Sequence, residues 1–154
     1  MKNKILVITG MFFLFASCTN NSIYRQNKHI SETGWHKDSV VQFVANVTDT
    51  VNLFDIYITT RNTNDYSLQN LFLFVQTTSP YENFIVDTVN ILLADDYGQW
   101  TGKSISRIWE NNFLLRKNIK FANKGNYKFA INQAMRYDIL NGISDVAIHI
   151  ERAE

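Results

Sequence analysis

Cysteine, proline and clustered positive charge are what this sequence has least of. Its 154 residues include one cysteine, Cys18, and one proline, Pro80. A single cysteine excludes an internal disulfide, so the folded part must hold together by packing. The formal net charge is only +1, and no basic stripe or tail occurs, which argues against a nucleic-acid-binding protein. Glycine-rich phosphate loops and Gly-x-Ser-x-Gly nucleophile motifs do not occur in the sequence either.

Residue patterns typical of metal sites are also scarce. The three histidines, His29, His36 and His149, lie far apart in the sequence, and none has a second ligand at the short spacing of a zinc site. Asp95 and Asp96 offer oxygen ligands to calcium, but the alternating acidic loop with its distal glutamate is missing. We therefore expect no metal and no cofactor, and we interpret the Asp95-Asp96 pair as part of an ordinary turn.

Paired carboxylates are the one hint of enzyme chemistry. Asp87 with Asp95, or Glu110 with Asp145, would be able to flank a glycosidic bond if the fold placed them at the right separation. Surface solvation is the default role of such residues, and no nucleophile motif accompanies them. The sequence therefore predicts no catalytic residues, and we expect that the protein is not an enzyme.

The clearest signal lies at the N-terminus. The basic residues Lys2 and Lys4 are followed by an apolar run over residues 5–15 and by the small residues Ala16-Ser17, immediately before Cys18. This order is typical of a bacterial lipoprotein signal, in which the cysteine thiol receives a diacylglyceryl group and a peptidase then cuts before it. A membrane-spanning helix is the alternative, but such a helix needs about 20 apolar residues. We therefore predict that Cys18 is lipidated.

The chain is expected to have three parts. Residues 1–17 form the signal peptide, residues 18–30 form a polar tether from the lipidated cysteine, and residues 31–154 form a single domain. An apolar content of 45% is enough to fill one sizeable core in such a domain. Because each buried methylene contributes about 0.8 kcal/mol, several acyl chains would anchor the protein firmly to a membrane without spanning it.

Alternating apolar residues predict β-strands from residue 40 onward. The runs cover residues 41–47, 54–58, 71–75, 84–92, 113–121, 127–131 and 146–150. Residues 71–75 are apolar on both faces, which predicts a central strand. Residues 123–126 have the composition of a hairpin turn, so the fifth and sixth runs are predicted to be antiparallel neighbours.

Two segments between the runs are less regular. Ile105, Ile108, Trp109 and Asn112 have helical spacing, which indicates one short helix or a loop, and residues 133–141 indicate a helical or irregular turn. Because brief helices cannot supply the crossovers of a parallel sheet, we predict an all-β fold, an antiparallel β-sandwich of about seven strands with one or two short helices. A partly closed barrel is the alternative.

Four aromatic residues form the candidate ligand or partner surface. These are Trp35, Tyr97, Trp100 and Trp109. The strongest turn, residues 94–98, leads into Trp100, which we expect to cover one end of the core, and packing is also the expected role of Trp35. A ligand-binding module would present such rings in an open groove, whereas an interaction subunit would present a flatter apolar patch.

Four segments follow one another along the chain: YSLQNLFLF at residues 66–74, Asp87-Thr88 with LLADDYGQWTG at residues 92–102, GNYKF at residues 125–129, and QAMR at residues 133–136. In this order they resemble the gliding-motility lipoprotein GldH family of Bacteroidetes. The resemblance implies a non-enzymatic envelope lipoprotein, grouped with the gliding and type IX secretion machinery and bound to other envelope proteins. The alternative function is a β-sandwich module that binds a glycan or peptide.

The resemblance also suggests a location. Surface-exported lipoproteins of this phylum resemble one another in having acidic residues just after the lipidated cysteine, whereas this chain has none before Glu32. We therefore expect the domain to face the periplasm. Outer-membrane attachment is expected over inner, because no aspartate follows Cys18.

Overall fold

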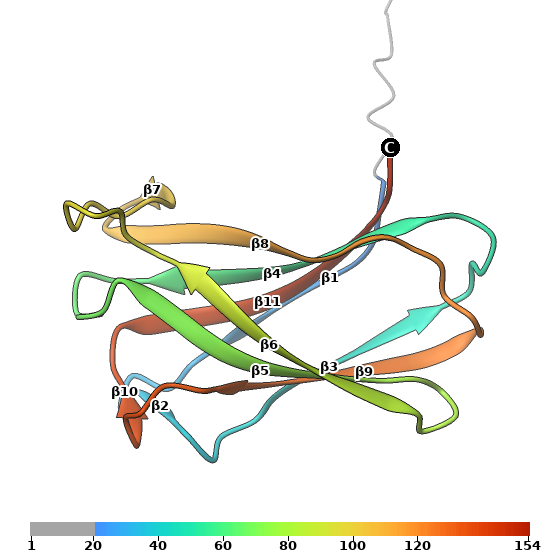
Figure 1. The fold of residues 1–154 in the computed structure, drawn as a ribbon, viewed down its shortest axis with the longest axis horizontal. Helices are drawn as coiled ribbons and strands as arrows, with labels where there is room; N and C mark the ends of the chain where they lie inside the picture. Colours follow the sequence, from blue (N-terminus) through green and yellow to red (C-terminus); the bar gives the residue numbers. More distant parts are fainter. Residues whose placement is uncertain (1–20) are drawn as a thin grey trace, which may run out of the picture.

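The computed structural model describes residues 21–154, which form eleven β-strands and no helix. The strands build two antiparallel sheets that face each other as a sandwich (Figure 1). Within the described residues, no helix is long and apolar enough to cross a membrane. The predicted signal peptide and the predicted lipidation site, Cys18, lie outside the described residues.

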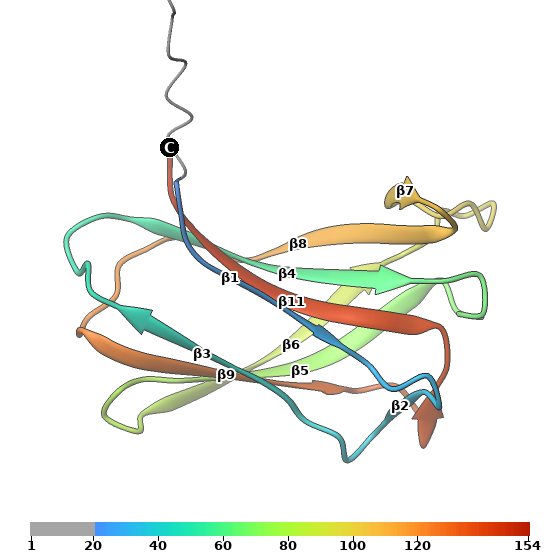
Figure 2. The ribbon, with the colours of Figure 1, turned by 180° about the vertical axis from the view of Figure 1, so that it is seen from behind.

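Two sheets and one short ribbon account for all eleven strands. The five-stranded sheet has the order β1 (Ser22–His29), β11 (Ile143–Arg152), β4 (Phe54–Asn62), β8 (Ile108–Ile119), β7 (Lys103–Ile105). The four-stranded sheet has the order β3 (Val41–Val47), β9 (Gly125–Gln133), β5 (Asn70–Thr78), β6 (Phe84–Leu92). A ribbon of β2 (Trp35–His36) and β10 (Ile139–Leu140) lies beside one end of the sandwich (Figure 2).

The core follows from period-two alternation. In β3, Val41, Phe43, Ala45 and Val47 are buried and the residues between them are exposed. The odd-numbered residues of the four-stranded sheet, such as Leu73 on β5, face buried residues of β4 and β11 within one apolar cluster. Burying each large apolar side chain contributes about 1.5–3 kcal/mol, so this layer holds the sheets together without a disulfide.

The predicted β-sandwich is thus observed, but the predicted short helices are absent from the described residues. Where a helix was expected, β7 and β8 form a hairpin whose two turn residues, Ser106 and Arg107, have φ angles of 48° and 68°. Two consecutive left-handed residues are the signature of a type I′ hairpin turn and cannot continue a right-handed helix. Residues 133–141 form an irregular segment that ends in the two-residue strand β10.

The predicted pairing of the fifth and sixth runs is wrong. β8 pairs with β4 and β7, whereas β9 pairs with β3 and β5, so residues 120–124 cross from one sheet to the other. Phe121 explains the crossing, because its buried ring packs between Phe54 and Tyr127, at centroid distances of 5.4 and 4.8 Å. A tight hairpin would have placed that ring in solvent.

The predicted polar tether is also wrong for most of its length, because Ser22–His29 is strand β1. It pairs with β11, and the Asn27 amide donates a hydrogen bond to Asp145 Oδ1 at 3.0 Å. Burial favours the neutral Asp145 carboxyl, but hydrogen bonds from Asn27 and Ser144 outweigh this effect and hold the pKa of Asp145 below its ordinary value. Backbone pairing needs no apolar pattern, so a polar edge strand was indistinguishable from a tether in the sequence.

Candidate functional site

The four candidate aromatic residues lie in different environments. Trp35 is only 1% exposed and donates a hydrogen bond from Nε1 to the Ser39 carbonyl at 2.9 Å, so it belongs to the core and not to a surface. Tyr97 is 90% exposed at the tip of the 94–100 loop. Trp100 and Trp109 are both half-buried and lie against each other, with ring centroids 5.8 Å apart.

Trp100 forms the wall of a corner where its own loop (residues 94–100) meets the loop that carries Asn64 and Tyr66 and the start of β8, which carries Trp109. Its ring also contacts Tyr66, at a centroid distance of 6.3 Å, and its Nε1 donates to the Asn64 side chain at 3.2 Å. The turn beneath it is closed by Asp95, whose Oδ1 accepts the backbone N–H groups of Tyr97 and Gln99 at 2.9 and 2.8 Å. Asp95 therefore has a structural role, as the interpretation of this segment as a turn predicts.

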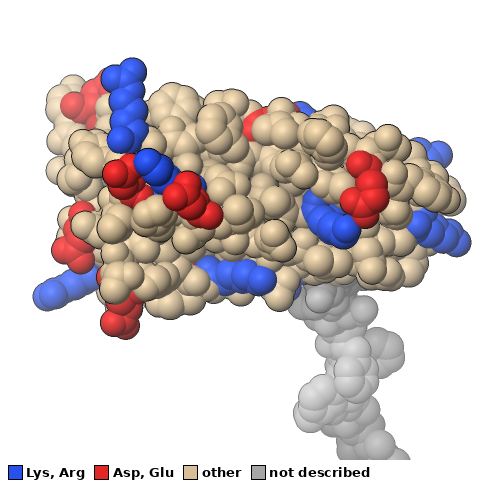
Figure 3. Space-filling model, turned by 90° about the horizontal axis from the view of Figure 1, so that it is seen from below, with Lys and Arg blue, Asp and Glu red and all other residues tan. Residues whose placement is uncertain are grey.

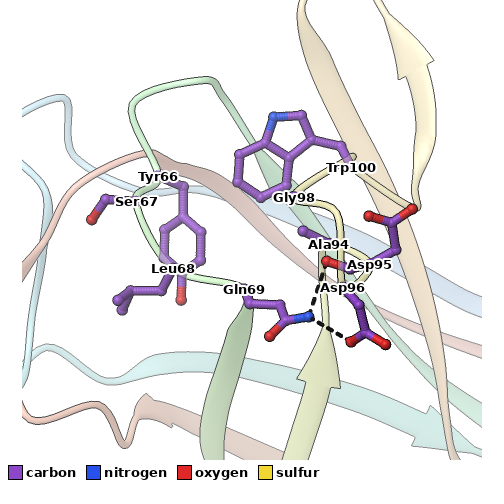
Figure 4. A pocket seen from close by; sticks show the side chains of 9 residues that line it. All are labelled: Tyr66, Ser67, Leu68, Gln69, Ala94, Asp95, Asp96, Gly98 and Trp100. Carbon is purple, nitrogen blue, oxygen red and sulfur yellow. Dashed lines mark hydrogen bonds between the residues drawn. The ribbon is translucent and has the colours of Figure 1, made fainter.

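An open cavity of about 430 Å³ lies at this corner, and we call it the corner pocket (Figure 4). It is lined by Tyr66, Ser67, Leu68, Gln69, Ala94, Asp95, Asp96, Gly98 and Trp100. The Gln69 amide donates to the Asp95 carbonyl at 3.0 Å and to Asp96 Oδ1 at 3.4 Å. One aromatic wall beside a carboxylate and an amide suits hydrogen bonding to a small polar ligand.

Tyr66 is fixed in its protonated form. Its hydroxyl donates a 2.6 Å hydrogen bond to the Asn70 carbonyl, and burial raises the pKa of Tyr66 well above its ordinary value. A phenol held this way is a structural donor and does not act as a base near neutral pH. The corner pocket therefore offers recognition by shape and hydrogen bonding.

The position of Tyr66 depends on the lack of a side chain at Gly142. A Cβ at Gly142, whose φ is +84°, would overlap the backbone N and Cα of Tyr66. The Gly142 carbonyl also accepts the Thr63 N–H at 2.8 Å. The loop that carries Tyr66 therefore lies directly on the Gly142 backbone, and this close approach requires glycine.

The carboxylates considered for catalysis are each engaged by other groups. Asp87 accepts two 2.6 Å hydrogen bonds from Arg116, and Glu110 accepts one from Arg61 at 2.8 Å. Strand pairing places Arg61 between Glu110 and Asp145, so the basic side chain lies between the two acids of that pair. These contacts are those of structural ion pairs, which hold adjacent strands together.

The histidines do not converge. His29, His36 and His149 each lie nearest a different carboxylate, at 3.4, 3.6 and 3.5 Å respectively. Among residues 21–154, no group of three or more His, Cys, Asp or Glu side chains is placed to hold a metal ion.

A second surface was not identified in the sequence. The even-numbered residues of β3, β9, β5 and β6 point away from the core, and we call the surface they form the outer face. Its exposed apolar residues are Val44, Phe72, Phe74, Phe84, Val86 and Leu92. Figure 3 shows this side of the molecule, where charged side chains lie mostly toward the two ends.

Almost all residues of the outer face are uncharged. Lys128 is the only charged residue at the even-numbered positions of these strands, and its Nζ lies 2.8 Å from the Glu82 carboxylate. Next to this ion pair is a groove of about 400 Å³, whose lining includes Gln42, Gln76 and Phe84. The signal in the sequence is the two-sided apolar pattern of residues 71–75. β5 is a central strand of its sheet, as that pattern predicts, but Phe74 on its outer side is 48% exposed.

Comparison with known proteins gives a consistent set of relatives. The sequence model of the GldH lipoprotein family matches residues 22–150. A protein described as a gliding motility lipoprotein GldH homolog, from Christiangramia forsetii, is 34% identical over 98% of this chain and 96% of its own length. The gliding motility lipoprotein GldH of Flavobacterium johnsoniae is 32% identical over 100% of this chain and 99% of its own.

Solved structures are much less similar. An infectious bursal disease virus VP2 subviral particle structure has 16% identity and a TM-score of 0.33 over 84% of this chain, which spans only 30% of the viral chain. A TM-score this low does not indicate a shared fold.

Proposed function

Because the chain belongs to the GldH lipoprotein family, we propose that it is a non-enzymatic, lipid-anchored subunit of the cell envelope that binds other envelope proteins. The process it would serve is gliding motility or the associated type IX secretion. The observation that carries this proposal is the outer face, a sheet surface with six exposed apolar residues and a single charged residue, Lys128, which is paired with Glu82.

The size of the outer face suits a protein partner. Four strands about 4.8 Å apart and up to nine residues long, at about 3.3 Å per residue, cover a flat area of roughly 500 Å². Side chains add relief to that area, so the accessible surface approaches the roughly 800 Å² that each partner buries in a standard interface. Phenylalanine is enriched at interface centres, and Phe72, Phe74 and Phe84 provide it here.

The placement of the chain ends supports this use of the outer face. Asn21 accepts a hydrogen bond from the Arg152 N–H at 2.9 Å, so both ends of the described chain lie together, on the side of the five-stranded sheet (Figures 1 and 2). Three residue steps from Cys18 to Asn21 span at most about 11 Å. A lipid at Cys18 would therefore hold the domain close to the bilayer, with the outer face on the side away from the chain ends.

We further propose that the domain faces the periplasm from the outer membrane. The reason is the absence of an acidic residue between Cys18 and Glu32. Partners would then be other periplasmic or membrane-bound envelope proteins. Protease added to intact cells should leave the domain uncut, and digestion without permeabilisation would contradict this orientation.

Lipidation is tested with Cys18→Ala in the native host. Labelled fatty acid should be incorporated into the unsubstituted protein and not into the variant. Continued labelling of Cys18→Ala would show that the lipid is attached elsewhere.

Partner binding is tested with Phe74→Lys, which places a charge in the middle of the outer face. We expect it to abolish the recovery of partner proteins cross-linked in the native envelope, while the melting temperature stays close to that of the unsubstituted protein. Leu114→Lys is the matched control, since Leu114 is an exposed apolar strand residue of the five-stranded sheet. Equal recovery with both variants would refute docking on the outer face.

The corner pocket supports a second candidate function, glycan or peptide binding. Tyr66 and Trp100 give it an aromatic wall, and Asp96 with Gln69 gives it polar groups. Gln69→Ala should then weaken binding to envelope glycan fragments, measured by calorimetry, without changing partner recovery. No heat of binding with the unsubstituted protein would exclude a glycan ligand among the fragments tested.

A further inference from the structure

Strand β6 is a long sheet edge with little protection. It pairs with β5 over nine residues without a bulge and is the last strand of the four-stranded sheet. Proteins usually shield such edges with lysine, proline, bulges or short strands. β6 contains no lysine or proline, and three consecutive apolar residues, Phe84, Ile85 and Val86, are exposed.

Other edges of the sandwich differ from β6. The edge strands β1 and β3 contact each other on the far side of the molecule (Figure 2). At the other end of the five-stranded sheet, β7 has only three residues. β6 is therefore the one edge of the four-stranded sheet, within residues 21–154, that combines length, regularity and an apolar composition.

The ladder shows which backbone groups of β6 face outward. At one end Ser79 N–H donates to Asn83 O, and at the other Leu93 N–H donates to Gln69 O, both at 2.8 Å. Hydrogen-bonded pairs alternate along an antiparallel ladder, so the odd-numbered residues between these ends bond to β5. The even-numbered residues of β6, from Phe84 to Leu92, direct their N–H and C=O groups away from the sheet. At the Leu92 end the carbonyl accepts a hydrogen bond from the Thr101 hydroxyl at 3.3 Å, which leaves its second lone pair for a paired strand.

We propose that two copies of this chain pair β6 with β6 in antiparallel orientation, about a two-fold axis through Thr88. This register is the one in which all nine residues are paired, and it places each even-numbered residue opposite an even-numbered residue of the second copy. Phe84 then lies opposite Leu92, and Thr88 lies opposite Thr88. The result is a continuous eight-stranded sheet.

The near absence of charge on β6 favours pairing with a second copy of β6 over pairing with a charged strand of another protein. The position of its one charged residue also selects the register. Asp87 is the only charged residue of β6, and Arg116 holds it in a two-bond ion pair. In the proposed register Asp87 lies opposite Val89 of the second copy. An axis shifted by one residue, to Asp87, would place the two carboxylates opposite each other, which is destabilising.

The interface is small, so the dimer is reversible. A nine-residue strand is about 30 Å long, and edge pairing of that length lies near the lower limit of about 1,000 Å² for specific interfaces. The pairing joins the two outer faces on one side of the sheet. It does not depend on whether that face binds another protein.

Disulfide cross-linking tests the register directly. Thr88→Cys, in the full-length protein in its native envelope, is treated with a mild oxidant. Residues in a hydrogen-bonded antiparallel pair have Cα atoms about 5.5 Å apart, which lies within the range of a disulfide. Asn90→Cys is the matched control, because the two Asn90 positions would be offset by four residues, roughly 13 Å along the strands.

We expect at least ten-fold more disulfide-linked homodimer with Thr88→Cys than with Asn90→Cys. The unsubstituted chain measures any cross-link through Cys18. Adding Val86→Lys to Thr88→Cys should abolish the dimer, because it places two charges at the edge. Adding Val44→Lys should preserve it, since Val44 is on the same face at similar exposure, 52% against 55%, but on β3.

Three results would overturn the proposal. Equal cross-linking at Thr88→Cys and Asn90→Cys would indicate association without a register. No homodimer with either cysteine would exclude β6 pairing between copies. A disulfide from Thr88→Cys to a different protein would show that β6 accepts a foreign strand instead. None of these results bears on partner recovery by the Phe74→Lys variant, so the two proposals fail separately.

Discussion

Alanine at Gly142 should be far more damaging than alanine at Gly98, although both glycines have left-handed φ angles, +84° and +78°. A Cβ at Gly98 meets nothing within 4 Å, whereas one at Gly142 overlaps the backbone of Tyr66. The two substitutions therefore share the cost of the φ angle and differ in the close approach. The pair isolates the contact that supports the corner pocket.

The magnitudes follow from two effects. A left-handed φ costs a non-glycine residue about 1–2 kcal/mol, and reduced entropy of the unfolded chain returns about 0.4–1 kcal/mol. Gly98→Ala should thus lower the free energy of unfolding by about 1 kcal/mol. The overlap at Gly142 involves backbone atoms that cannot rotate away, so it should add about 2–3 kcal/mol, the upper part of the usual cost of overpacking. Gly142→Ala should therefore cost about 3–4 kcal/mol.

Urea denaturation followed by circular dichroism measures both values. For a domain of this size, each 1 kcal/mol corresponds to roughly 4 °C in melting temperature, so Gly142→Ala should melt more than 10 °C below the unsubstituted protein. Gly98→Ala should fall by about 4 °C. Equal losses for the two variants would refute the close approach at Tyr66.

Other predictions concern packing and pH. Trp35→Ala should lower the free energy of unfolding by about 3–5 kcal/mol, because Trp35 is buried. Trp100→Ala should lower it by about 2 kcal/mol, because Trp100 is only half-buried. Equal losses by urea denaturation would contradict this order. Burial lowers the pKa of His149, with Arg25 adding to the effect and Glu151 opposing it. As the pH falls, His149 therefore takes up a proton in the unfolded chain at a higher pH than in the folded one. The free energy of unfolding should thus be constant above about pH 7 and decrease as the pH falls through about 6.5. The melting temperature of His149→Phe should fall less between pH 7.5 and pH 5.5 than that of the unsubstituted protein. An equal fall would exclude His149 as the source of the pH dependence.

The strands were predictable where side chains alternate. Phe43, Ala45 and Val47 face the core in the structure as their spacing predicts, because burial on one face imposes a period of two. The order of strands was not predictable by the same means. Phe121 lies between the sheets, and its burial takes the chain across the sandwich at the place where the composition of residues 123–126 predicts a hairpin turn.

Features that depend on backbone hydrogen bonds left no pattern in the sequence. β1 is polar because it lies at the edge of the sheet, and β11 supplies its pairing. The tight turn at Ser106 and Arg107 has no glycine or asparagine, so the sequence lacks the usual signal of a hairpin and its apolar spacing predicts a short helix or a loop. The outer face was not predictable because residue type alone does not distinguish an apolar residue at an exposed position, such as Phe74, from one in the core.

Site-specific photo-crosslinking in living cells tests the central claim most directly, that this lipoprotein binds an envelope protein through its outer face. A photoreactive phenylalanine analogue would replace Phe74 on that face, Leu114 on the five-stranded sheet, or Tyr97 at the corner, one position at a time. The account predicts a discrete adduct with another envelope protein from position 74, and none from position 114. Adducts from position 97 alone, with none from position 74, would contradict it and assign binding to the 94–100 loop beside the corner pocket.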